Sequence, residues 1–230
     1  MTQIDIIWEK VLSKEQIDLL PLLRDITQTH TLIWGTAIAL QLWHRKSIDY
    51  DCINNTHQWS IADFKTKVEK YGFALDKDEL SAYFWSEYEN QDEIHLTVNW
   101  VRLSLFNYYR TLYDDQIITI QQNSYVLWDI PSVCLEQLLC MKLFACITRN
   151  KWKDAVDIYF LLEKLELTLE YYLELCEHKY FIGIFNREAV LEQFISWNWD
   201  TTEKVDYLID NPPSDTEIIE YLKQQSLQNI

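Results

Sequence analysis

Residues 31–53 read TLIWGTAIALQLWHRKSIDYDCI, and this stretch decides the fold. Its apolar, β-prone beginning stops at Gly35, and a strong helix-forming run follows over 36–43. Residues 47–53 then alternate polar and apolar side chains, which is the period of a half-buried strand. The order strand, tight turn, buried helix and second strand predicts a core that combines a sheet with helices.

Segments on either side of this stretch extend the predicted sheet and its helices. Residues 94–98 and 101–106 are strand-like runs that we expect to form a hairpin, and a further short strand is predicted at 125–128. Upstream, residues 4–26 favour short amphipathic helices, one of which Pro21 should interrupt or restart.

The pattern changes after Pro131, where apolar residues recur with the period of a helix. Helices are predicted over 132–148, 151–165, 167–176, 187–197 and 216–225. The fold class we expect is α+β, with a small mixed-sheet core and amino-terminal helices in residues 1–130. A carboxy-terminal helical lobe should occupy residues 131–230.

Composition excludes several classes of protein. The chain of 230 residues has only three glycines, too few for a Rossmann fingerprint or a Walker loop. Its five cysteines include no C-x-x-C pair, which favours reduced core thiols over disulfides or zinc. No apolar run reaches the roughly 20 residues of a membrane span, and the amino terminus lacks a secretion signal, so we expect a cytoplasmic protein. A net charge of −16 repels nucleic acid and favours cationic partners.

Asp49 and Asp51 are the sharpest chemical feature. In a strand they point to the same face, and two carboxylates at this spacing can bind Mg²⁺ that also contacts the phosphates of a nucleotide. An exposed edge strand would also explain the pair. Upstream, Gly35 and Thr36 stand at a predicted helix amino terminus, which is either an ordinary turn or a cradle for phosphate. The basic segment 44–47, HRKS, leads into the carboxylate strand and is otherwise a solvated helix end.

These residues together resemble the signature of AbiEii/AbiGii-type nucleotidyltransferases, a toxin-like branch of the polymerase-β-like superfamily. A second block carries the same resemblance. Met141-Lys142-Leu143 precedes residues 148–162, TRNKWKDAVDIYFLL, which is similar to the family motif of a lysine, a basic turn and a K-D-x-x-D-x-Y helix.

The resemblance implies transfer of a nucleotide from an NTP to an acceptor, with Mg²⁺ as cofactor. It implies that Asp49 and Asp51 are metal ligands and that activity depends on Lys142 and Asp154, contributed by the helical lobe. It places the nucleotide-binding residues in the first block, at Gly35, Thr36, Arg45, Lys46 and Ser47. It also implies a toxin or phage-defence component with RNA, often tRNA, as acceptor, and an antitoxin as a possible partner.

Departures from the family pattern keep other hypotheses open. Trp34 stands where the family commonly has a second glycine, and residues 101–106 offer no third carboxylate. A second hypothesis is therefore a catalytically impaired protein that binds nucleotides or a partner. The acidic charge supports a third, nucleotidylation of a small cationic molecule such as an aminoglycoside. Lys142 alone could simply reach solvent, and Asp154 and Asp157 could simply pair with Lys151 or Lys153. The enzymatic interpretation requires that both blocks meet in one pocket.

Overall fold

The computed structural model describes residues 9–54, 61–75, 93–106, 124–126, 130–196 and 198–228. Its sheet has six strands in the order β3-β4-β2-β1-β6-β5. The pairs β2–β4 and β1–β6 are parallel, and the pairs β1–β2, β3–β4 and β5–β6 are antiparallel. The strands are β1 (His30–Ile33), β2 (Asp49–Asn54), β3 (Glu93–Val98), β4 (Val101–Phe106), β5 (Ser124–Val126) and β6 (Ile130–Ser132). The mixed sheet and the helices after it confirm the predicted α+β class.

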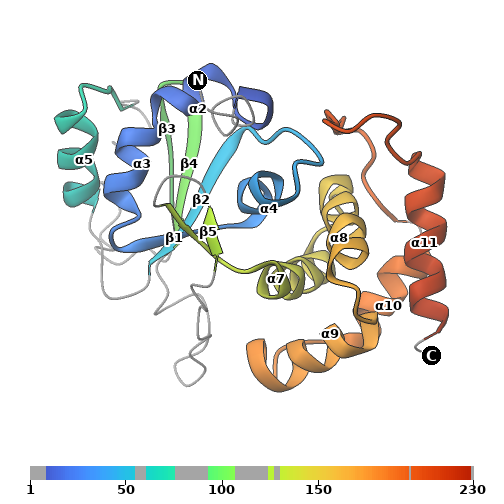
Figure 1. Ribbon diagram of the computed structural model, residues 1–230. Helices are drawn as coiled ribbons and strands as arrows, with labels where there is room; N and C mark the ends of the chain where they lie inside the picture. Colours follow the sequence, from blue (N-terminus) through green and yellow to red (C-terminus); the bar gives the residue numbers. More distant parts are fainter. Residues whose placement is uncertain are drawn as a thin grey trace.

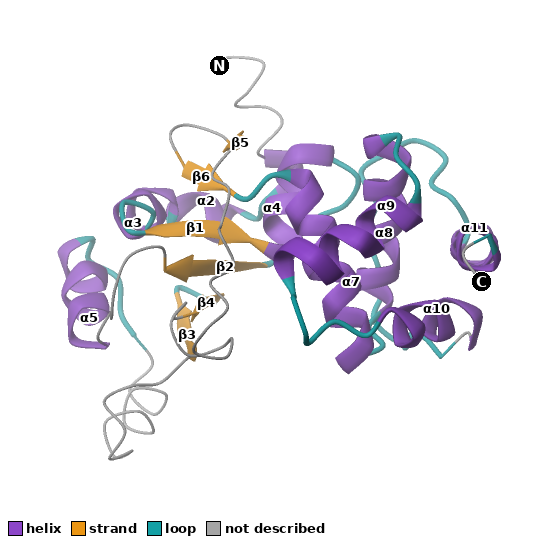
Figure 2. Cartoon of the chain, turned by 90° about the horizontal axis from the view of Figure 1, so that it is seen from below, coloured by secondary structure: helices purple, strands orange, loops and turns teal. Residues whose placement is uncertain are grey.

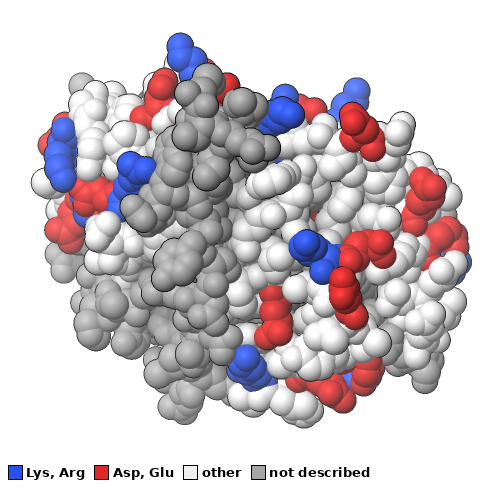
Figure 3. Space-filling view, in the orientation of Figure 1, with Lys and Arg blue, Asp and Glu red and all other residues white. Residues whose placement is uncertain are grey.

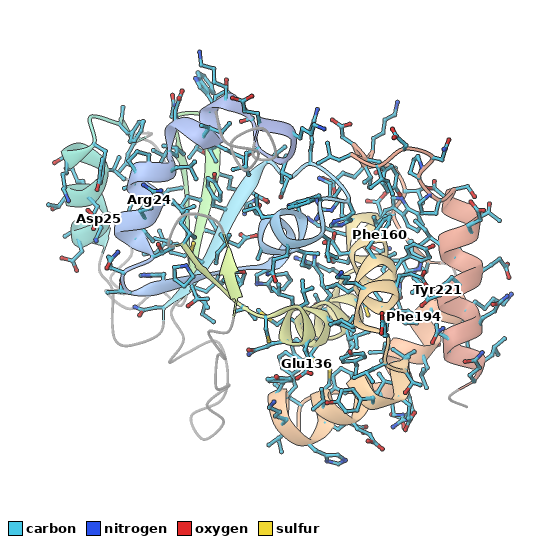
Figure 4. All side chains as sticks on the ribbon, viewed as in Figure 1. Arg24, Asp25, Glu136, Phe160, Phe194 and Tyr221 are labelled. Carbon is cyan, nitrogen blue, oxygen red and sulfur yellow. The ribbon has the colours of Figure 1, made fainter. Side chains whose placement is uncertain are left out.

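Helices of the amino-terminal part border the sheet (Figure 1). They are α2 (Lys14–Asp18), α3 (Leu20–Ile26), α4 (Trp34–Leu42) and α5 (Ile61–Lys70). Pro21 occupies the first turn of α3, where its missing N–H costs nothing, so it restarts the helix as predicted. Asp25 on α3 pairs with Lys67 and Lys70 of α5 and thereby ties these two helices together (Figure 4). Residues 4–8, the start of the first predicted helical stretch, lie outside the described residues.

Helices α7 (Leu135–Thr148), α8 (Trp152–Leu165), α9 (Leu169–Leu175), α10 (Arg187–Ser196) and α11 (Asp215–Leu227) make up the helical part. A π-helical turn, Cys176–Tyr180, continues α9 beyond its predicted end. Aromatic side chains fill the space between these helices, where Phe160 of α8 and Tyr221 of α11 both contact Tyr159 edge-on (Figure 4).

Strand β6 was not expected from the sequence. Pro131 cannot donate a ladder hydrogen bond and usually marks the end of a strand, so the predicted helix began at residue 132. In the structure Pro131 pairs with Tyr125 of β5, Ser132 lies beside Leu32 of β1, and α7 begins only at Leu135. Of the strand predicted at 125–128, the first two residues are in β5 and the others lie outside the described residues.

The hairpin between β3 and β4 forms as predicted. Asn99 and Trp100 have φ values of 49° and 68°, the left-handed pair that a two-residue I′ turn requires. All five cysteines are free, and four of them are buried, as expected for reduced core thiols. Within the described ranges, none of the helices has the length and apolar character needed to cross a membrane.

Helix α4 is the element that joins the two parts. It lies between the sheet and the helices α7 and α8 (Figures 1 and 2), and it contacts β1, β2, α7 and α8. Ala37, Ile38 and Ala39 on this helix are fully buried. Because α4 packs on both sides, its amino terminus and the adjacent end of β2 face the helical part, and this fixes the place of the site.

Candidate active site

A cavity of about 330 Å³ opens where the sheet meets the helical part. Residues from both sequence blocks line it: Gly35, Arg45, Ser47, Asp49 and Asp51 from the first block, and Lys142, Arg149, Lys151, Lys153 and Asp154 from the second. Trp34, Ile48, His95, Arg102, Ser104, Phe106 and Glu203 complete the lining. Segments a hundred residues apart in the sequence therefore meet in one pocket.

Strand β2 carries the two carboxylates. Asp49 and Asp51 lie on the same face of the strand, and their neighbours on parallel β4 are Arg102 and Ser104. Burial and the charge of Asp49 raise the pKa of Asp51 to about 7, although a hydrogen bond from Ser104 acts in the opposite direction. The carboxylates of Asp49 and Asp51 are thus close to each other, and in the described residues no basic side chain forms an ion pair with either of them.

The amino terminus of α4 lies beside these carboxylates because Ile33, its N-cap, pairs with Asp51. Ile33 has no polar side chain, so it does not cap the first-turn amides of the helix. A Cβ atom on Gly35 would come within 2.7 Å of the Arg45 guanidinium. Glycine leaves room here for the close approach of the Arg45 guanidinium, which adds a cation to the positive end of the helix.

Thr36 and Ser47 are buried hydroxyl residues that hold the start of β2 in place. Their hydroxyl oxygens are 2.6 Å apart, and the Thr36 hydroxyl also donates to the Asp49 carbonyl. Ser47 lines the cavity as well, and its hydroxyl lies 3.4 Å from the Asp49 carboxylate. The structure thus places Thr36 behind the carboxylate strand, as a residue that fixes its position.

Asp157 is a buried carboxylate that joins the two blocks. Arg45 donates to both of its oxygens, at 2.7 and 2.8 Å, and the Lys142 ammonium lies 2.8 Å away. His44 Nε2 is 2.8 Å from Oδ1 of Asp157. Burial alone would raise the pKa of Asp157, but the attraction of Arg45 and Lys142 holds it well below its usual value. Trp43, with φ 55°, ends α4 in the left-handed region, and the chain continues into His44 and Arg45.

Lys142 and Asp154 form the second ion pair of the pocket. The Lys142 Nζ donates to Asp154 at 2.5 Å, and Arg149 donates to both oxygens of Asp154, at 2.7 and 3.2 Å. Burial disfavours the charged lysine, but the carboxylates of Asp157 and Asp154 outweigh it and raise the Lys142 pKa. Lys142 and Arg149 in turn lower the pKa of Asp154, although burial alone would raise it. Asp154 is therefore an ionised residue that orients Lys142 and is poorly suited to accept a proton.

The remaining basic residues divide into two groups. Lys151 and Lys153 line the cavity, and Lys153 pairs with Glu203. Lys46 instead pairs with Asp206 at the surface, where both side chains are at least half exposed. The structure does not bring Lys46 together with the other predicted nucleotide-binding residues.

The simpler interpretations of the second block were wrong. Lys142 is buried and does not reach solvent, and the partners of Asp154 and Asp157 are Lys142, Arg149 and Arg45. The sequence alone does not indicate that Asp157 links the two blocks, nor that Arg102 and Ser104 line the cavity. The alternation in 101–106 placed Arg102 and Ser104 on one face, but only the parallel pairing of β4 with β2 shows that this is the face of Asp49 and Asp51.

The chemistry of the donor set fits Mg²⁺. This ion binds hard oxygen ligands, often one or two carboxylates, and completes its shell with water and substrate phosphates. Asp49 and Asp51 supply two carboxylates, whereas Ser104 occupies the neighbouring position on β4. Among the described residues, no group of three or more His, Cys, Asp or Glu side chains is placed to hold a metal ion. A bound ion would therefore depend on phosphate and water for the rest of its shell.

Comparison with known proteins agrees with this geometry. The family model for the nucleotidyl transferase AbiEii toxin of type IV toxin–antitoxin systems matches residues 35–192. The chain belongs to the AbiEii nucleotidyltransferase toxin family. The AbiEii match begins at Gly35 and continues into α10, so it includes both blocks and most of the helical part.

Solved structures show the same fold. A candidate nucleotidyltransferase from H. pylori superposes with a TM-score of 0.54 at 15% identity, covering 93% of this chain and 92% of its own. The protein JHP933 from Helicobacter pylori gives a TM-score of 0.51 at 15% identity, covering 94% of this chain and 92% of its own. No match was found among curated proteins. The fold of this AbiEii member is thus shared with the two Helicobacter proteins along nearly the whole chain.

The raised pKa of Asp51 predicts that Asp51→Asn stabilises the metal-free protein. Because the pKa of Asp51 is higher in the folded state than in the unfolded state, this carboxyl lowers the free energy of unfolding as the pH rises from about 4 to about 7. The gain from the substitution should therefore be small at pH 4 and reach about 1 kcal/mol or more at pH 8. Urea unfolding in EDTA at both pH values measures this. A gain that does not depend on pH would contradict the electrostatic origin.

Loss of Asp157 is predicted to destabilise the protein strongly. Asp157→Asn leaves the buried Arg45 and Lys142 with a neutral partner, and the expected loss is about 3 kcal/mol. The matched control is Asp206→Asn, which removes an exposed pair with Lys46 and should cost less than about 1 kcal/mol. Urea unfolding of both variants at neutral pH makes the comparison, and equal losses would contradict the role given to Asp157.

Proposed function

We propose that the cavity binds an NTP together with Mg²⁺ and transfers its nucleotide to an RNA acceptor, with tRNA as the first candidate. The observation that carries this proposal is the joint lining of one pocket by Asp49, Asp51 and Gly35 from the first block and Lys142 from the second. Carboxylates, a helix amino terminus and a buried ammonium together are suited to a metal-bound triphosphate.

Each wall of the pocket has a distinct part in this proposal. Asp49 and Asp51 would hold the Mg²⁺, which supplies charge neutralisation for the triphosphate. Phosphate oxygens would bind the amide groups around Gly35 and the N–H groups of Arg45 that Asp157 and the Lys46 carbonyl leave available. Ser47 would keep Asp49 in place. In this scheme Thr36 acts through the backbone of β2, and Lys46 has no part in binding the nucleotide.

Lys142 would stabilise the charge that develops on the triphosphate as the nucleotide is transferred. Its raised pKa keeps it protonated at neutral pH, and Asp154 and Asp157 fix the position of its ammonium group. A charged group held in place in this way stabilises a transition state without having to reorganise. Asp154 would therefore contribute by orienting Lys142.

The charge around the cavity favours an anionic acceptor. Six Lys or Arg side chains line it against four Asp or Glu side chains, although the whole chain carries −16. On the face seen in Figure 3, many of the acidic side chains lie over the helical part on the right. A basic cavity in an acidic protein suits RNA phosphates better than a cationic aminoglycoside. We also infer that an antitoxin counteracts the activity, as the type IV family implies.

The decisive experiment is labelling. The protein is incubated with each radiolabelled NTP and Mg²⁺, with tRNA, with an aminoglycoside, or with neither. We expect label in tRNA, and we expect Asp49→Asn to reduce it at least about a hundredfold. Asp206→Asn is the control and should retain full activity. Label in the aminoglycoside would contradict the RNA acceptor, and Mg–NTP binding without any labelling would favour the catalytically impaired protein.

The exposed side chain of Lys151 is predicted to contact acceptor phosphate. Lys151→Ala should weaken tRNA binding and lower the slope of log K against log salt by about one. Lys46→Ala is the matched control, since it removes an exposed lysine outside the described cavity lining, and its slope should equal that of the wild type. Filter binding over a salt series gives both slopes. Equal effects of the two variants would show non-specific attraction.

A further inference from the structure

Trp34 has an unusual backbone conformation for a large side chain. It is the first residue of α4, and its φ of 62° lies in the left-handed region, where glycine is favoured and a bulky residue is strained. Strain of this kind persists only where surrounding contacts hold it, and it gathers at functional sites. The contacts of the indole therefore need an explanation beyond the turn from β1 into α4.

The indole of Trp34 contacts two cations of the pocket. The Arg149 Cζ lies 4.5 Å from the ring centroid and the Lys142 Nζ lies 5.7 Å from it, both within the range of cation–π attraction. All three side chains line the cavity. The ring is thus placed on the wall of the pocket, next to Gly35 and the helix amino terminus.

Arg149 needs such a support more than Lys142 does. Lys142 is held by two buried carboxylates and its side chain is only 4% exposed. Arg149 follows the last residue of α7 with an extended backbone, and its side chain is 37% exposed. Among the described residues, its ion-pair partner is Asp154 alone. An exposed arginine with a single ion-pair partner would often break that pair and bind water in its place. The indole supplies the second side.

We propose that Trp34 is a positioning residue that holds the Arg149 guanidinium on Asp154, so that Arg149 faces the triphosphate end of the cavity. The ligand named here rests on the proposed function, whereas the restraint on Arg149 does not. Trp34 acts through Arg149, and its strained backbone is the consequence of placing an aromatic ring at this point of the turn.

Two measurements test the proposal with the full-length protein. The first is the exchange of the Arg149 Nε–H with water, followed by NMR, which needs no ligand. The second is the Kd of inorganic tripolyphosphate, measured by calorimetry in wild type, Trp34→Gly, Arg149→Ala and the double variant. Trp34→Phe retains a ring, and Trp100→Gly is the matched control, because Trp100 has φ 68° and is 89% exposed in the hairpin turn.

We expect Trp34→Gly to accelerate the exchange of the Arg149 Nε–H and to raise the Kd of tripolyphosphate about fivefold. Trp34→Phe and Trp100→Gly should change this Kd less than about twofold. Arg149→Ala should raise the Kd about tenfold in the wild type and less than about twofold in Trp34→Gly. Additive effects, or tighter binding by Trp34→Gly, would overturn the proposal. If the wild type binds neither tripolyphosphate nor Mg–NTP, the proposed function fails, and unchanged exchange in Trp34→Gly would then refute the role of Trp34 separately.

Discussion

The contact on which this structure depends is the buried carboxylate of Asp157 with its three basic partners. His44 and Arg45 come from the segment between α4 and β2, and Lys142 comes from α7. A buried charge is costly unless it is paired and hydrogen-bonded, so the meeting of these groups stabilises the folded chain strongly. One interaction thereby fixes the helical part against the sheet and places Lys142 opposite Asp49 and Asp51.

The electrostatics of the pocket follow from that arrangement. On one side, Asp154 and Asp157 form ion pairs with Arg45, Lys142 and Arg149. On the other side, Asp49 and Asp51 repel each other, and the pKa of Asp51 rises toward neutrality. A metal-bound triphosphate carries both signs of charge and complements both sides. The repulsion between the two carboxylates on β2 therefore destabilises the folded protein. A cation bound between them would restore that stability.

Local patterns in the sequence were sufficient to predict much of the fold. The stretch from β1 to β2, the hairpin at Asn99 and the restart of the helix at Pro21 all depend on residues close in sequence. Strand β6 was missed because it contains Pro131 and depends on β1, which is distant in the chain. The role of Asp157 was missed for the same physical reason, because its partners lie more than ten residues away in the sequence. The resemblance to a family was needed to select Lys142 and Asp154.

The most direct test is a crystal structure of the protein with Mg²⁺ and a non-hydrolysable NTP. We expect a metal ion between Asp49 and Asp51, with the triphosphate reaching the amide groups at Gly35 and the ammonium of Lys142. A nucleotide bound with its phosphates away from both blocks, while the ion pairs of Asp157 remain intact, would contradict it.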